Sequence, residues 1–147
     1  MKRHPSLAHL SREHHGALIL ARLLQKDAPA YKDLPFDTEG KAQYALKFYR
    51  EELVKHFEEE ERVLKLVTGI NDKLNSLIVA TFNEHQQLHV LFKSINTHPD
   101  VTTLIDEIGK TLEIHVRKEE RELFPLIQET CSEEVMIAID RSLSSNL

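Results

Sequence analysis

The sequence has very few of the residues on which several protein classes depend. It contains one cysteine, Cys131, and no tryptophan among its 147 residues. A single cysteine excludes an internal disulfide and a dithiol redox centre. Only four glycines and five prolines interrupt the chain, and 29% of the residues are charged. This composition favours a helical protein over a sheet-rich one.

Charge and hydropathy argue against two classes of partner. The formal net charge is −5, whereas a nucleic-acid binder normally carries a basic face. No apolar run approaches the ~20 residues that span a bilayer. The basic start, MKRHPSLAHLSREHH, lacks the uninterrupted apolar core of a signal peptide. We therefore expect a cytoplasmic protein with one domain over 1–147 and with neither a nucleic-acid nor a membrane partner.

Helical periodicity runs through nearly the whole chain. It is interrupted at the segment DAPAYKDLPFDTEG, at Gly69 and at NTHPD. The pattern predicts helices over about 6–26, 38–68, 72–96 and 100–128, with Pro125 bending the last, and a short tail helix over about 132–142. Mostly short connections favour antiparallel neighbours. We therefore expect an all-α, up-down-up-down four-helix bundle over about 6–128, followed by the tail helix.

Histidine is unusually frequent, with nine copies, and two of them begin the same motif. HFEEEERVL at 56–64 and HVRKEEREL at 115–123 both read H-x-x-x-E-E-R-x-L. An earlier Glu-His pair precedes each motif, namely Glu13-His14 and Glu84-His85. The sequence therefore indicates an internal repeat, in which the same helical hairpin occurs twice.

Helical spacing predicts which of the polar residues lie on the apolar stripe of each helix. The inward set is His14, His56, Glu60, His85, His89, His115 and Glu119. His14 is favoured over His15, which shares its face with charged residues. Glu119 is favoured over Glu120, because a residue at i+5 is turned about 140° from its partner. Both choices rest on the stripe alone.

The remaining glutamates and histidines are expected outside this set. Glu58, Glu59 and Glu61 are predicted to lie on a solvated face, because they fall off the apolar stripe of their helix. His4, His9 and His98 are predicted to be surface residues.

The inward set needs a physical explanation. A single inward histidine is more often a hydrogen-bonded core residue than a ligand. Two buried carboxylates, however, cost many kcal/mol without compensation, and no inward Lys or Arg is expected. A cation would supply that compensation. Five imidazoles and two carboxylates are too many donors for one four-coordinate zinc, but they suit two metals. Nitrogen-rich ligation without thiolate favours iron, with manganese and zinc as alternatives.

Counting ligand positions predicts an open site. Two octahedral metals need twelve positions; bridging by Glu60 and Glu119 fills four and the five histidines fill five. An oxo or hydroxo bridge would take two of the remaining three. One position is left for a small ligand such as O2.

The layout H … HxxxE … HxxxH … HxxxE resembles the hemerythrin-like (HHE cation-binding) family over nearly the whole chain. HVRKEERELFP is especially similar to that family's second repeat. The resemblance implies a non-haem di-iron centre inside a four-helix bundle. Its HxxxH pair resembles the oxygen-carrying hemerythrins, which implies one iron on His85, His89 and His115 and the other on His14 and His56.

The sequence departs from the oxygen carriers at one point. They usually have an Asp five residues after the last histidine, whereas this chain has Glu119 at four and Glu120 at five. The HxxxE form is similar to hemerythrin-like domains with sensing or iron-centre repair roles.

We therefore predict a di-iron protein that handles O2, a related small oxidant or NO, by binding, sensing or scavenging. A sensor would need a protein partner or a homo-oligomer. The alternatives are an enzyme, either an iron-centre repair protein or a di-iron oxidase or peroxidase, and a metal-independent interaction bundle. A binding protein is favoured over an enzyme because no separate general base or nucleophile stands out. The metal-independent bundle would leave two buried carboxylates unexplained.

Overall fold

The computed structural model describes residues 2–144, and every regular element within that range is helical. In chain order the elements are α1 (Pro5–Leu23), α2 (Thr38–Phe48), η1 (Tyr49–Leu53), α3 (Val54–Val67), α4 (Asp72–Lys93), α5 (Val101–Lys118), η2 (Glu119–Leu123), α6 (Phe124–Thr130) and α7 (Glu133–Ser144). The prediction of an all-α chain is confirmed. No helix of the described range is long and apolar enough to cross a membrane.

Side-chain caps explain where the helices begin. The Asp37, Asn71 and Asp100 side chains each accept a hydrogen bond from a backbone N–H in the first turn of α2, α4 and α5. His4 does the same for α1, where its Nδ1 accepts from the Ser6 N–H at 3.1 Å. These caps satisfy N–H groups that have no partner inside a helix.

Two rods are each built from three consecutive elements. The segments α2, η1 and α3 follow one another without a break, as do α5, η2 and α6. The η1 and η2 segments are single π-helical turns, which the sequence pattern did not predict. A π turn inserts one extra residue and shifts the stripe beyond it. After η2 the buried residues are Phe124 and Ile127, whereas an unbroken stripe through Leu123 leads to the half-buried Leu126.

The remaining boundaries differ from the predicted ones by a few residues. The helix predicted over 6–26 ends at Leu23, and the tail helix runs to Ser144 rather than 142. Pro125, predicted to bend the fourth helix, stands at the start of α6, directly after η2. It has no N–H for an intrahelical bond, so the helix loses one hydrogen bond at this point.

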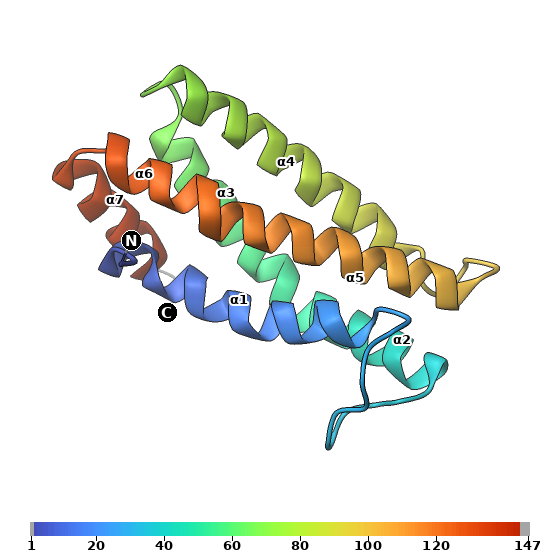
Figure 1. Ribbon diagram of the computed structural model, residues 1–147. Helices are drawn as coiled ribbons and strands as arrows, with labels where there is room; N and C mark the ends of the chain where they lie inside the picture. Colours follow the sequence, from blue (N-terminus) through green and yellow to red (C-terminus); the bar gives the residue numbers. More distant parts are fainter. Residues whose placement is uncertain (1, 145–147) are drawn as a thin grey trace.

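The long helices lie side by side along most of their length (Figure 1). Helix α5 packs against both α1 and α4, and α3 packs against the same two helices. Helix α7 folds back onto α1 and α3 near the N-terminus (Figure 1). Helices α1 and α5 approach each other closely at Gly109, where an added Cβ would lie 2.4 Å from the Ala21 carbonyl oxygen.

The apolar core is divided into two clusters. One contains Leu20, Leu46, Phe92 and Leu112 among others, and the second contains Leu7, Leu64, Phe124 and Ile139 among others. The molecule has four rods, namely α1, α2–η1–α3, α4 and α5–η2–α6, and each contributes to both clusters. The change from one cluster to the other falls close to the buried histidine of each rod: His14, His56, His85 and His115. A polar layer therefore lies between two apolar halves.

Candidate metal centre

Six of the seven residues in the predicted inward set come together in this polar layer. They form two groups, His14, His56, Glu60 and Glu119 in one and Glu60, His85, His115 and Glu119 in the other. Within each group the atoms that could hold a metal all lie within 4.8 Å of one another, and every member is buried. Glu60 and Glu119 belong to both groups.

The two carboxylates face histidine nitrogens from both sides. Glu60 Oε2 lies 3.2 Å from His14 Nε2 and 3.2 Å from His56 Nε2, while its Oε1 lies 3.1 Å from His85 Nε2. Glu119 Oε1 lies 3.2 Å from His14 Nε2 and 3.0 Å from His115 Nε2. Ligands bonded to one ion at about 2.1 Å stand about 3.0 Å apart in an octahedron and about 3.4 Å apart in a tetrahedron. The observed separations match such a coordination shell.

Three atoms at this position have no hydrogen-bond partner. His115 Nε2 and both carboxylate oxygens of Glu119 are buried without one, although His115 Nε2 and Glu119 Oε1 are only 3.0 Å apart. Leaving such groups unsatisfied costs about 1–3 kcal/mol each, and more for a charge. A cation between them would accept the nitrogen lone pair and neutralise the carboxylate. The donor set therefore fits a metal.

Each of the four histidines in the two groups forms a hydrogen bond through Nδ1, on the side away from the centre, with a further carboxylate. The Nδ1 atoms of His14, His56, His85 and His115 lie 2.7, 2.9, 2.8 and 2.8 Å from Glu120, Glu13, Glu61 and Glu84, respectively. An Nδ1–H that donates to a carboxylate leaves the Nε2 lone pair free to point inward. This is the arrangement that a metal-binding histidine requires.

The outer carboxylates are themselves anchored. Glu120 accepts hydrogen bonds from Ser11 Oγ at 2.8 Å and from Arg3 Nη2 at 3.1 Å. Glu84 accepts one from Lys118 Nζ at 2.7 Å. Burial would raise the pKa of Glu120, but its bonds to His14 and Ser11 lower that pKa to about 2. It is therefore an anion at neutral pH.

Sequence reasoning missed this outer set. Glu61, predicted to be solvated, bonds His85, and Glu120 lies against His14 instead of pointing away. A signal was present, because the outer glutamates are the Glu of each Glu-His pair and the second Glu of each H-x-x-x-E-E motif. The repeat thus marks two kinds of glutamate.

The prediction of a solvated face is also wrong for Glu59. Its side chain is 3% exposed and lies 3.1 Å from His9 Nε2, and His9 itself is half-buried rather than a surface residue. Glu58 is exposed, as expected. The packing of α1 against α3 covers this side of the helix, which spacing within α3 alone does not reveal.

His89 is the one member of the predicted set outside both groups. Its Nδ1 lies 2.6 Å from the Tyr49 hydroxyl, and its ring meets Phe57 edge-on at 5.4 Å between centroids. Burial, together with the charge of nearby His85, lowers its pKa. His15, the alternative to His14, is exposed.

Electrostatics at the centre favours positive charge. Burial would lower the pKa of each inner histidine, but the glutamates outweigh it and raise the pKa of His56 to about 9 and of His115 to about 10. The pKa values of His14 and His85 are raised in the same way. Burial would raise the pKa of Glu60, but the surrounding histidines hold it well below its usual range. A metal that binds here must therefore displace protons.

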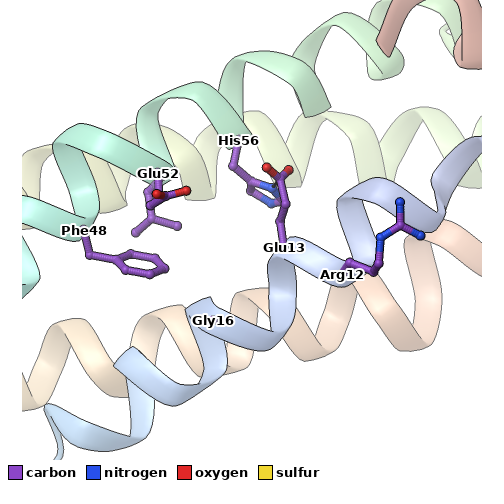
Figure 2. Close-up of a pocket in the computed structure, with 7 residues that line it drawn as sticks. Arg12, Glu13, Gly16, Phe48, Glu52 and His56 are labelled. Atoms are coloured by element: carbon purple, nitrogen blue, oxygen red, sulfur yellow. Dashed lines mark hydrogen bonds and ion pairs between the residues drawn. The ribbon is translucent and has the colours of Figure 1, made fainter. Parts of the chain in front are cut away.

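A pocket of about 210 Å³ reaches the outer side of His56. Figure 2 shows Glu13 and Gly16 on one wall and Phe48, Glu52 and His56 on the other. Gly16 has no side chain to fill the space between α1 and Phe48. Because a water molecule takes about 30 Å³, the pocket can admit diatomic ligands and hydrated ions close to the centre.

Fold and site together define an all-helical cation-binding domain with its histidines and glutamates in a buried layer. The sequence profile described as the hemerythrin HHE cation binding domain matches residues 5–127. The chain therefore belongs to this family, and the resemblance drawn from the sequence is confirmed. Searches among curated proteins and among solved structures returned no match.

Proposed function

We propose that this protein is a non-haem di-iron protein that binds O2, a related small oxidant or NO. The observation that carries the proposal is that two groups of potential ligands share Glu60 and Glu119. Two shared carboxylates are what a pair of adjacent metal ions needs as bridges. The bound irons would supply the electrons that such small ligands take up, and the chain supplies the ligands and a dry environment.

In this proposal His14 and His56 hold one ion, and His85 and His115 hold the other. His89 is the fifth histidine, on the same ion as His85. Its ring lies one helical turn from His85, and both rings pack on Phe57. The Tyr49 hydroxyl at Nδ1 takes the place that a carboxylate has in the other four histidines. The unequal division, three histidines against two, leaves the open position on the ion of His14 and His56.

The access route supports the same assignment. The pocket in Figure 2 ends at His56 and Glu13, on the side of the ion with fewer histidines. Apolar side chains close the centre elsewhere; Phe57 and Phe124 are almost fully buried. A small ligand would thus enter past Glu13, and the apolar side chains keep water from the centre on its other sides.

Iron is proposed over zinc and manganese because four or five imidazoles with two carboxylates and no thiolate suit Fe best. We also propose that the chain is a single domain with its four rods in antiparallel up-down-up-down order, and that it works in the cytoplasm. The contacts of α7 with α1 and α3 support a tail helix that belongs to this domain.

Metal content and the absorption spectrum of protein purified in air test the proposal. Two irons per chain with oxo-to-iron charge-transfer bands in the near ultraviolet are expected. One zinc per chain, or no metal after expression with added iron, would overturn the di-iron centre. Mixing the reduced protein with O2 then tests the role. A colour change that reverses on degassing indicates binding, whereas irreversible oxidation with formation of peroxide or water indicates an oxidase.

A further inference from the structure

A third group of potential metal ligands lies outside the two groups of the centre. It consists of His9 and Glu13 on α1 and Glu59 on α3, whose ligand atoms lie within 4.8 Å of one another. None of the three belongs to the inner set. His9 and Glu59 were expected to face solvent, so this group is a feature of how α1 and α3 pack.

The distances from His9 to the two glutamates are close to those of a coordination shell. His9 Nε2 lies 3.1 Å from Glu59 Oε2 and 3.6 Å from Glu13 Oε2. Ligands at about 2.1 Å from one ion stand about 3.0–3.4 Å apart, so small side-chain shifts would suffice. One imidazole and two carboxylates form a mixed N/O set typical of Fe²⁺, Mn²⁺, Co²⁺ or Zn²⁺.

Glu59 is a buried carboxylate with one oxygen that accepts no hydrogen bond. Its side chain is 3% exposed, and its Oε1 has no hydrogen-bond partner. Lys55 forms a long ion pair with Oε1 at 3.8 Å, and its side chain is 57% exposed, so solvent weakens this pair. A buried carboxylate left in this state is costly, and a cation at His9 would occupy the side on which its Oε2 lies.

The group is accessible from solvent, unlike the centre. The His9 and Glu13 side chains are 32% and 25% exposed, whereas those of His14 and Glu119 are 2% and 1% exposed. Glu13 connects the two places, because its Oε1 accepts from His56 Nδ1 at 2.9 Å while its Oε2 faces His9. A cation held here would be one carboxylate away from a histidine of the centre.

We propose that His9, Glu13 and Glu59 bind a further divalent cation of the first transition row, at a surface site that shares the Glu13 carboxylate with His56. Water fills the remaining positions, as expected for a site with three protein ligands. The site has no ligand in common with the two inner groups, so it does not depend on which metal resides in the centre.

Titration with Co²⁺ tests this site. Protein whose resident metal has been counted by elemental analysis is titrated with Co²⁺, followed by its visible absorption and by the cobalt retained per chain. We expect one additional equivalent with unchanged resident metal. The Glu59→Gln and His9→Gln variants should bind this equivalent at least about 10-fold more weakly. Glu58→Gln and His15→Gln, at exposed neighbouring positions, should bind it as the unmodified protein does.

Several results would overturn the site. They are no additional equivalent in the unmodified protein, cobalt uptake only in exchange for resident metal, or equal binding by Glu59→Gln and Glu58→Gln. Circular dichroism checks that each variant is folded. If Glu59→Gln does not fold, His9→Gln, at a half-buried position, carries the test alone against His15→Gln.

Discussion

The Glu61→Gln substitution tests whether the outer carboxylates hold the inner histidines in place. Glu61 Oε2 lies 2.8 Å from His85 Nδ1. Glutamine keeps the size of the side chain and can still accept this hydrogen bond, but it carries no charge. A hydrogen bond to a charged group contributes about 1.5–3 kcal/mol, against about 1 kcal/mol for a neutral one.

The expected loss follows from this difference. Removing the charge should cost about 1–2 kcal/mol of metal binding, which corresponds to about 5–30-fold in affinity at 1.36 kcal/mol per factor of ten. It arises because the carboxylate makes His85 a stronger donor and fixes its ring orientation. Competition for Zn²⁺ against a chromophoric chelator measures the change without redox chemistry.

Glu58→Gln is the matched control. It removes the same charge from the same helix three residues earlier, but Glu58 is exposed and acts on His89 only through the field of its charge, as Glu61 also does. General electrostatic effects of the lost charge therefore largely cancel between the two variants. Equal Zn²⁺ affinity in Glu61→Gln and Glu58→Gln would refute the positioning role of Glu61.

Three further results are expected. Glu60→Ala and Glu119→Ala should each remove at least one metal ion per chain, whereas elemental analysis of Glu58→Ala should show little change; equal loss in all three would contradict the assignment of Glu60 and Glu119 as bridges. In metal-free protein the melting temperature should fall as pH rises from 7 to 10. In the folded state the pKa is about 9 for His56 and about 10 for His115, raised from 6.5. The stability that these protonated histidines add is therefore fully present below pH 6.5 and is lost as pH rises through their folded-state pKa values. Metal-loaded protein should lack this dependence, because its Nε2 atoms bind metal rather than protons. A melting temperature of the metal-free protein that does not change with pH would contradict the charged histidine–glutamate pairs. Gly109→Ala should lower the free energy of unfolding by about 1–3 kcal/mol, because the added Cβ would clash with the Ala21 carbonyl at the α1–α5 contact. Chemical denaturation measures this loss. The control Gly16→Ala should show no such loss, because its Cβ would meet Phe48 at 3.4 Å.

Helical spacing predicted the inner layer well because that layer depends on geometry within one helix. Glu60 faces the core because it stands four residues after His56 in an uninterrupted α-helical stretch, and Glu119 stands at the same distance from His115. The all-helical fold follows from the same periodicity and from the capping residues at the helix starts.

The parts that spacing did not predict depend on neighbouring helices or on local backbone breaks. Glu59 and Glu61 are covered or engaged by residues of α1 and α4, and nothing within α3 indicates this. The π turn before Pro125 shifts the buried position from Leu126 to Ile127. His89 turns its Nδ1 toward Tyr49, which lies in the other π turn and forty residues away in sequence.

The outer carboxylates connect the two copies of the hairpin in a reciprocal way. Glu61 of the first hairpin orients His85 of the second, and Glu120 of the second orients His14 of the first. Each half orients one of its own histidines, His56 by Glu13 and His115 by Glu84, but neither half has its full set of oriented histidines before the other has docked onto it. The halves therefore assemble and form the metal-binding site in the same step, and a bound ion would hold them together because its ligands come from both halves. A chain interrupted in the loop between α3 and α4 should accordingly reassemble more tightly when metal is supplied than when it is withheld.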